Sequence, residues 1–223
     1  MKSSLSRRVA AEFLGTGFLV AAVVGSGIMG ERLAGGNAAI ALLANTIATG
    51  AALAALIQAL RPISGAHLNP IVSIAEAFHG GIARKDAGLY VPAQVCGGIA
   101  GTACANLMFA LPAFSISHHA RTGAPVWFSE FVATFGLLLV IRTVARFSPD
   151  GLPFAVAAYI VAAYWFTAST SFANPAVAIA RSLTDTFAGI RPVDVPAFLA
   201  AQFAGGLSAL IVSDWLSLRP GDV

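Results

Sequence analysis

The chain has 223 residues, of which 57% are hydrophobic and 10% are charged, with a formal net charge of +3. A soluble domain carries about 25% charged residues, so this composition argues against a soluble protein and indicates that the chain lies in a lipid bilayer. Six spanning helices of about 20 residues each, with short connections, would use up the length. We therefore expect one membrane domain over residues 1–223.

Hydropathy predicts these six spanning helices and two shorter apolar pieces. In chain order, the spans are Ala10 to Met29, Ala38 to Leu60, Ala87 to Ala110, Val126 to Ala145, Leu152 to Ala168, and Val195 to Leu216. The two shorter pieces, Pro70 to Phe78 and Pro175 to Leu183, cannot cross a bilayer, and each begins with Asn-Pro. We interpret them as re-entrant half-helices, which gives an all-α membrane protein.

The positions of Lys and Arg predict the orientation of these spans. Nine lie in segments on the side of the N-terminus and four in segments on the opposite side. The nine are Lys2, Arg7, Arg8, Arg61, Arg84, Lys85, Arg142, Arg146 and Arg219, and the four are Arg32, Arg121, Arg181 and Arg191. By the positive-inside rule, both termini are expected to be cytoplasmic. Topology thus accounts for the basic residues, and no nucleic-acid partner is needed.

Three polar features recur in the same order in the two halves of the chain. Glu12-Phe13 returns 118 residues later as Glu130-Phe131, and Asn69-Pro70 returns 105 residues later as Asn174-Pro175. Gln94 with Gly97-Gly98 returns 108 residues later as Gln202 with Gly205-Gly206. We interpret these matches as two repeats, over about residues 8–112 and 124–218. Because three spans separate corresponding points, the second repeat enters the membrane from the opposite side, and the two half-helices meet near the midplane.

Each Asn-Pro pair is a strong signal for the start of a helix, because Asn is a favoured N-cap and Pro a favoured first helical residue. Capping uses the side-chain oxygen, so we expect the side-chain NH₂ groups of Asn69 and Asn174 to donate hydrogen bonds to a solute in a pore. Each half-helix also directs the positive end of its dipole at this point. Two such ends repel cations, including hydrated protons.

The two segments Ser64-Gly65-Ala66-His67-Leu68-Asn69-Pro70-Ile71 and Ser171-Phe172-Ala173-Asn174-Pro175-Ala176-Val177 resemble the paired motifs of the aquaporin and aquaglyceroporin (major intrinsic protein) family. The resemblance covers almost the whole chain. It implies a homotetramer with one pore per subunit and no cofactor. It also implies that the residues of the two motifs, Asn69, Pro70, Ile71, Asn174, Pro175 and Ala176, line the pore.

The second motif departs from the family where the selectivity filter is expected. Val177 stands where most members carry an Arg, and Ile71 stands where the first motif usually has Ala. By the family's spacing, the other filter residues are Thr49, Ala162 and Ser171. Small or neutral groups therefore predict a wide, uncharged filter, closer to aquaglyceroporins than to strict water channels. The expected solutes are glycerol, water and arsenous acid, with methylated arsenicals also able to pass.

Arg181 has two alternative interpretations. It lies four residues after Val177 on one face of the half-helix, so its side chain can partly replace the missing filter Arg in the vestibule. It can equally pair with Asp185, four residues further on. The segment from Val177 to Asp185 is similar to bacterial members associated with arsenic resistance, which places the chain in the bacterial inner membrane as a multi-pass protein.

Glu12 and Glu130 are acids inside apolar spans, a feature that often marks function. Their repeat-related placement favours a structural role, in which they accept hydrogen bonds from the re-entrant loops, over a proton relay. Gln94 and Gln202 are expected to link helices in the same way. His67 is expected to pack the first loop rather than to gate the pore. His118 and His119 lie in an outer loop with no carboxylate or thiol near them in sequence, so a metal site is disfavoured.

Two other classes of function compete with a channel. A secondary transporter also uses inverted repeats and broken helices, but it is expected to need an ion or proton site at the midplane, where this sequence places two amides and no acid. An enzyme needs a nucleophile or base with an orienting group in a plausible motif, and the sequence offers none. We therefore expect a passive channel and no enzymatic activity.

Overall fold

The computed structural model describes residues 3–216, and these form helices and connecting loops without a strand. The α-helices are α1 (Leu5–Leu33), α2 (Ala38–Ser64), α3 (Pro70–Phe78), α4 (Arg84–Met108), α5 (Ala124–Phe147), α6 (Leu152–Phe166), α7 (Pro175–Arg181) and α8 (Val195–Leu216). Two short 3-10 helices, η1 (Pro149–Gly151) and η2 (Pro192–Asp194), precede α6 and α8. The six long helices and two half-helices are the predicted set.

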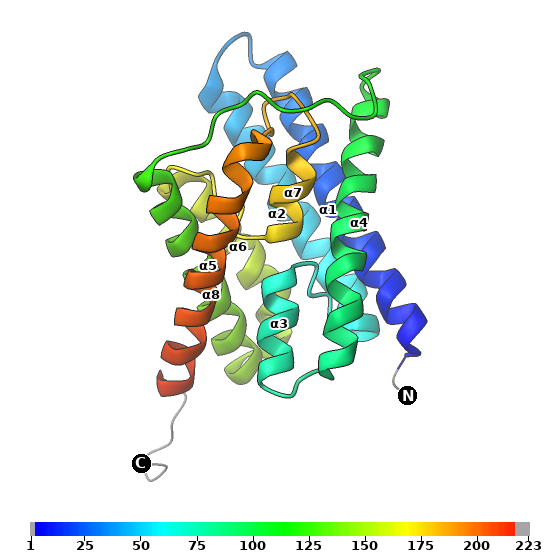
Figure 1. Ribbon diagram of the computed structural model, residues 1–223, viewed down its shortest axis with the longest axis vertical. Coiled ribbons are helices and arrows are strands. Elements are labelled where there is room, and N and C mark those ends of the chain that lie inside the picture. The colour runs from blue at the N-terminus through cyan, green and yellow to red at the C-terminus, as the bar shows by residue number, and fades with distance from the viewer. Residues whose placement is uncertain (1–2, 217–223) are drawn as a thin grey trace.

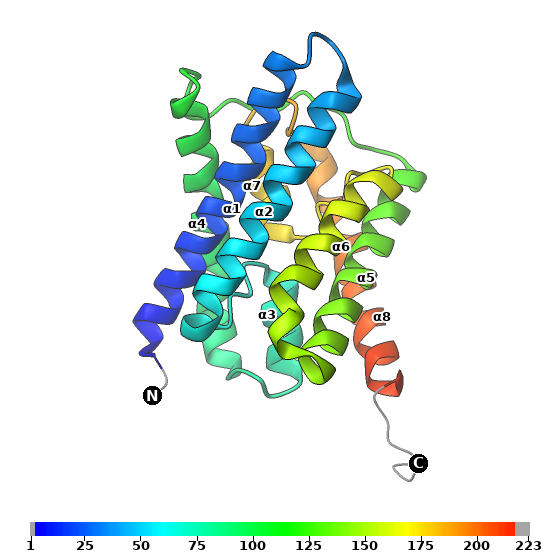
Figure 2. The same ribbon diagram turned by 180° about the vertical axis from the view of Figure 1, so that it is seen from behind.

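Several boundaries differ from the prediction. α1 begins five residues before and ends four residues after the predicted span, and α2 ends four residues after it. α7 ends at Arg181, two residues before the predicted end, because the carbonyl oxygens of Ser182 and Leu183 accept hydrogen bonds from the backbone of the outer loop, at Ser117 and Ser115. Of the described helices, α1, α2, α5 and α8 are long and apolar enough to cross a membrane by length and composition alone. α4 begins with three charged residues and α6 has only 15 residues, yet both lie alongside the others in the bundle (Figures 1 and 2).

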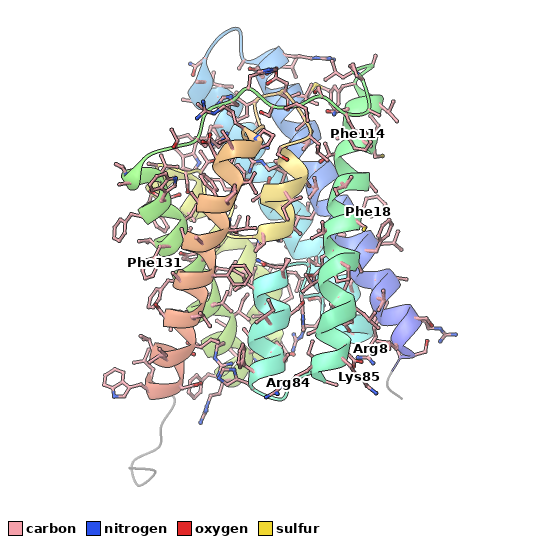
Figure 3. All side chains as sticks on the ribbon, viewed as in Figure 1. Arg8, Phe18, Arg84, Lys85, Phe114 and Phe131 are labelled. Carbon is pink, nitrogen blue, oxygen red and sulfur yellow. The ribbon has the colours of Figure 1, made fainter. Side chains whose placement is uncertain are left out.

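The two half-helices lie one above the other in the middle of the bundle, with their N-termini facing each other (Figure 1). α1 begins and α8 ends at the same end of the bundle, which fits an even number of crossings. Arg8, Arg84 and Lys85 lie at that end (Figure 3). Lys2 and Arg219, which the orientation prediction also used, lie outside the described residues.

Glycines allow the helices of each repeat to pack closely, and the contacts in the two repeats correspond. A Cβ at Gly97 of α4 would overlap the carbonyl oxygen of Phe13 in α1, and a Cβ at Gly205 of α8 would overlap that of Phe131 in α5. The next glycine in each helix contacts the half-helix of the other repeat. A Cβ at Gly206 would lie 2.7 Å from Cγ2 of Ile71 in α3, and one at Gly98 would lie 3.1 Å from the Ala180 side chain in α7.

The outer surface of the bundle is apolar and its interior holds polar side chains. Phe18 is 64% exposed and Ile211 is 73% exposed, whereas Glu12, Gln94, Glu130 and Gln202 are fully buried. Phe18 and Phe131 point outward on opposite flanks (Figure 3). This distribution reverses that of a soluble protein and matches a bundle whose solvent is lipid.

Candidate functional site

The two re-entrant loops share an unusual backbone conformation at equivalent positions. Ala66 and Leu68 have φ of 50° and 50°, and Ser171 and Ala173, which lie 105 residues later, have φ of 50° and 47°. The left-handed region costs a residue with a side chain about 1–2 kcal/mol, so these loops need support from their surroundings.

That support comes from the two buried glutamates, as the sequence predicts. Glu12 accepts hydrogen bonds from the backbone N–H groups of His67 (3.0 Å) and Leu68 (2.7 Å). Glu130 accepts the equivalent bonds from Phe172 (2.8 Å) and Ala173 (2.9 Å). Gln94 and Gln202 each add a side-chain N–H to the same carboxylate, at 2.8 Å and 2.6 Å respectively. Charged acceptors form strong hydrogen bonds, and these bonds hold the N–H side of each loop away from the centre of the bundle.

The two asparagines join the loops to each other. The Oδ1 atoms of Asn69 and Asn174 cap their half-helices through the N–H groups of Ile71 (3.0 Å) and Ala176 (3.0 Å). Asn69 Nδ2 donates to the carbonyl of Ala173, and Asn174 Nδ2 donates to that of Leu68, both at 2.8 Å. The expectation that each NH₂ group is wholly free is therefore too simple. One of its two N–H bonds fixes the opposite loop, which leaves one N–H for a solute.

A continuous cavity of about 350 Å³ runs past both asparagines. Arg61 and Glu76 line its inner end, and Val177 and Arg181 line its outer end. Along one side lie the two loops, over residues 65–69 and 171–174, and along the other lie apolar side chains of α1, α2, α5 and α6, including Leu53, Leu137, Val156 and Ile160. Within the described residues, no hydrogen bond reaches the carbonyl oxygens of residues 65–67 or 170–172. The cavity thus has polar groups on one side and an apolar wall on the other.

Three of the four predicted filter residues line the outer part of this cavity, namely Thr49, Ser171 and Val177. Ala162 does not line it, because this residue is exposed on the outside of α6. Tyr164 takes its place: it is 4% exposed, lines the cavity, and its hydroxyl donates to Thr49 Oγ1 at 3.4 Å. Ala162 and Tyr164 are two positions apart, which corresponds to about 200° of rotation around a helix. The predicted position was therefore on the wrong face of α6.

Arg181 is the largest of the fully buried side chains and also lines the outer end of the cavity. Its Nε donates to the carbonyl of Ala188, and its guanidinium carbon lies 3.5 Å from the centre of the Phe172 ring. The alternative of an ion pair with Asp185 is wrong. Asp185 instead accepts a hydrogen bond from the His118 backbone N–H (2.8 Å) and pairs with His118 Nδ1 (3.1 Å).

Comparison with known proteins identifies the family of channels to which this arrangement belongs. A sequence model of the family described as "MIP: Major intrinsic protein" matches residues 1–148. The chain belongs to the major intrinsic protein family. It is 57% identical over 216 residues to aquaglyceroporin AqpS from Rhizobium meliloti (strain 1021), a match that covers 97% of this chain and 92% of that protein.

A more distant relative is also an aquaporin, and a solved structure shares the fold. The chain is 33% identical over 149 residues to aquaporin NIP3-1 from Oryza sativa subsp. japonica, which covers 64% of this chain and 46% of that protein. Its fold matches the X-ray structure of the aquaglyceroporin from Plasmodium falciparum with a TM-score of 0.76 and 24% identity, over 95% of this chain and 96% of that one. The predicted fold class, six membrane helices and two half-helices, is thereby confirmed.

In this major intrinsic protein, the cavity is lined by the asparagines of the Asn69-Pro70-Ile71 and Asn174-Pro175-Ala176 motifs but not by the other four residues. Pro70, Ile71, Pro175 and Ala176 are buried beside it and do not line it, which corrects the expectation that the whole motifs face the pore. The reason is helical geometry, since the first turn of each half-helix packs against a long helix. Ile71 fills the space opposite Gly206, and the Ala176 carbonyl would lie 3.3 Å from a Cβ at Gly98.

The loop over residues 109–123 covers the outer side of the protein (Figure 1) and carries two histidines in different environments. Hydrogen bonds from the His118 backbone and ring lower the pKa of the Asp185 carboxyl below its usual value, so this residue stays ionised at neutral pH. Burial, together with the charges of Arg121 and Arg181, lowers the pKa of His119, so its imidazole is neutral at pH 7. No carboxylate lies near His118 in the sequence, but the fold brings Asp185 next to it.

Sequence reasoning missed most of the residues that line the cavity, and five of these are of interest here: Arg61, Glu76, Val72, Tyr164 and Phe172. The repeat could have found three of them. Val72 and Glu76 are 105 residues before Val177 and Arg181, and Phe172 is 105 residues after His67, which itself lines the cavity. His67 also packs its loop as predicted, because its Nδ1 lies 3.1 Å from Ser73 Oγ. No comparable signal marks Tyr164.

Proposed function

We propose that this chain is a passive channel for small uncharged solutes that carry several hydroxyl groups. The solutes are glycerol-like polyols, trivalent metalloid acids such as arsenous acid, methylated arsenicals, and water. The observation that carries this proposal is the two-sided cavity, which has paired amide donors and unpaired carbonyl acceptors on one side and an apolar wall on the other. The 57% identical relative is named an aquaglyceroporin, which supports the same class of solute.

The chemistry of such solutes fits the two sides. A hydroxyl group donates one hydrogen bond and accepts others, so a polyol or metalloid acid can donate to the loop carbonyls while it accepts from Asn69 and Asn174. Its remaining surface lies against Leu53, Leu137 and Val156. A solute that leaves water without losing hydrogen bonds avoids the main cost of entering a pore, whereas an ion would lose its hydration without a matching set of charges.

The width of the outer part favours polyols over water alone. Thr49, Ser171 and Val177 contribute small or medium-sized groups, and a valine takes the place of a long arginine at the position three residues after Asn174. A strict water channel is the alternative, and it would need a narrower ring. A secondary transporter is less well supported: Glu12 and Glu130 are occupied by loop hydrogen bonds, and Glu76, the one carboxylate among the described lining residues, lies at the inner end.

The remaining parts of the proposal follow from the family and from the orientation of the chain. We place the protein in a bacterial inner membrane as a multi-pass homotetramer with one pore per subunit, with cytoplasmic termini, and without enzymatic activity or a cofactor. The beginning of α1 and the end of α8 lie together with Arg8, Arg84 and Lys85, which supports the cytoplasmic assignment of that end.

Solute uptake in proteoliposomes tests the function. Purified protein is reconstituted, and the influx of water, glycerol, arsenous acid and a bulky hexitol is followed by light scattering or by arsenic content, with empty liposomes as control. We expect glycerol and arsenous acid to enter well above the control, the hexitol to be excluded, and no dependence on an imposed proton gradient. Water flux without glycerol flux would establish a strict water channel. Glycerol uptake that saturates or follows the proton gradient would establish a transporter.

A further inference from the structure

Arg181 is a buried cation with an unused hydrogen-bond donor. It is 2% exposed, and its Nη1 has no partner among the described residues. Arginine remains protonated in proteins, and within residues 3–216 no carboxylate pairs with it. A buried charge and a buried donor without a partner both cost free energy. Such a group in a folded protein calls for an explanation.

Two contacts fix the orientation of the Arg181 guanidinium group. The Ala188 carbonyl accepts from Nε, and the Phe172 ring covers one face of the guanidinium at 3.5 Å. These two contacts fix the plane of the group. Because Arg181 lines the cavity, its charge lies beside the cavity contents, and the buried Nη1 is its donor without a partner among the described residues. Ser171 Oγ, another buried polar atom without a hydrogen-bond partner, lines the same outer part.

We infer that Arg181 is the residue that excludes cations from this pore and binds the hydroxyl oxygen of an entering solute, one helical turn beyond the ring of Thr49, Tyr164, Ser171 and Val177. The ring then selects solutes by size, and Arg181 selects them by charge at a different position along the pore. The ring can stay wide while a permanent positive charge remains next to it. This inference rests on the proposed function, and it names the residue that determines selectivity between neutral solutes and cations.

The primary test compares Arg181→Met with Arg32→Met in proteoliposomes. Arg32 is a matched control: it also donates to a backbone carbonyl (Phe109, 3.0 Å) and lies over an aromatic ring (Phe109, 5.2 Å), but it is exposed and does not line the cavity. Proton and sodium leak are measured with trapped dyes, and glycerol influx is measured in parallel. We expect Arg181→Met to raise cation leak at least about tenfold, as the loss of roughly 1.4 kcal/mol of electrostatic barrier would, and Arg32→Met to leave it unchanged.

The charge-conserving variant Arg181→Lys separates the two roles of the side chain. It should keep cation leak at the wild-type level but lower glycerol influx, because lysine cannot reproduce the fixed planar donors of arginine. If Arg181→Met retains glycerol influx and shows wild-type cation leak, the inference is overturned and Arg181 is only structural. If the wild-type protein conducts no glycerol, the proposed function fails, while the leak measurement still decides the role of Arg181.

A second measurement leaves Arg181 in place, in case its replacement prevents folding. Ser171→Cys is made in a Cys96→Ser, Cys104→Ser background, since both native cysteines are exposed on α4. The rates of alkylation by anionic iodoacetate and by neutral iodoacetamide are compared, with free cysteine as reference. A nearby unpaired cation should raise the iodoacetate-to-iodoacetamide ratio at least about threefold over the reference. A ratio equal to the reference would overturn the inference, because it would show no positive potential at Ser171.

Discussion

The two half-helices occupy equivalent positions in the two repeats but present different chemistry to the pore. Both begin with an asparagine cap, and both are held by a buried glutamate and glutamine. The side chains that face the cavity differ after the shared valines, Val72 and Val177. Glu76 lines the inner end, and Arg181, 105 residues later, lines the outer end. The two repeats thus share the residues that support the loops, and they differ in the residues that line the two ends of the cavity.

This contrast separates two kinds of requirement. Residues that hold the loops satisfy the same backbone groups in both halves, so a change there removes hydrogen bonds on which the fold depends. Two residues that face the cavity keep polar atoms without a partner among the described residues, namely Nη1 of Arg181 and Oγ of Ser171. They are therefore free to differ between the two ends. Mutations of equivalent residues in the two repeats can test this separation.

The largest effect is expected for Glu130→Leu and Glu12→Leu, which remove the loop supports. Glu130→Leu leaves the backbone N–H groups of Phe172 and Ala173 and the Gln202 side chain without an acceptor, at about 1–3 kcal/mol each. Glu12→Leu leaves one donor more, because Ser64 also binds Glu12, at 2.6 Å. Both variants should lose monodisperse protein in size-exclusion chromatography, whereas the exposed Glu31→Leu should not. A stable Glu130→Leu channel would refute the structural role.

The second-largest effect is expected for the asparagines, where equivalent substitutions in the two repeats should change solute influx and cation leak alike. In Asn174→Asp, a carboxylate faces the Leu68 carbonyl that the amide bound at 2.8 Å, and it offsets the positive ends of the half-helix dipoles. Asn69→Asp places the same charge against the Ala173 carbonyl. We expect each to lower glycerol influx by about tenfold or more and to raise cation leak in proteoliposomes. A defect in only one of two well-folded variants would break the symmetry of the pair.

The sequence alone predicted the symmetric parts of the molecule well. Glu12, Asn69 and Gln94 recur with constant order, so their shared roles in the loops follow from hydrogen-bonding chemistry. Helix starts at Pro70 and Pro175 were also predictable, because Asn-Pro specifies a cap. The end of α7 was not, since it depends on hydrogen bonds with the outer loop that join residues far apart in the chain.

The residues that differ between the two repeats were harder to predict, because no equivalent residue in the other repeat indicates their role. The filter position on α6 depends on the rotation of this helix about its axis. Its residues are nearly all apolar, so hydropathy does not indicate which of its faces lines the cavity. The choice between the two interpretations of Arg181, a place in the vestibule or an ion pair with Asp185, depended on where Asp185 lies, and Asp185 pairs with His118 from the outer loop. The filter residue on α6 and the partner of Asp185 could therefore be identified only from contacts in the folded structure.

An intermediate effect is expected for Val177→Arg, which sharpens the difference between the two half-helices. A long, charged side chain would narrow the ring of Thr49, Tyr164 and Ser171 and add donors that suit water better than larger solutes. Glycerol and arsenous acid influx should fall at least about threefold more than water influx. Val177→Leu adds bulk without charge and separates the two causes. Equal loss of all solutes would indicate misfolding, and unchanged influx would remove Val177 from the filter.

The smallest effect is expected at Tyr164, and it decides which face of α6 forms the filter. Tyr164→Phe removes a hydroxyl that lines the cavity and donates to Thr49 at 3.4 Å. The loss of one hydrogen-bonding group is worth about 1 kcal/mol, so glycerol influx should fall by up to roughly fivefold, with little change in protein yield.

Ala162→Val is the matched control for Tyr164→Phe, because Ala162 lies two residues earlier on the exposed face of α6. Two added methyl groups there point away from the cavity and should leave the influx of glycerol and water unchanged. If Ala162 faced the constriction instead, the same methyl groups would narrow it and slow glycerol more than water. A selective glycerol defect in Ala162→Val, together with wild-type influx in Tyr164→Phe, would therefore reverse the assignment. That outcome would also mean that α6 is rotated about its axis relative to the arrangement described above.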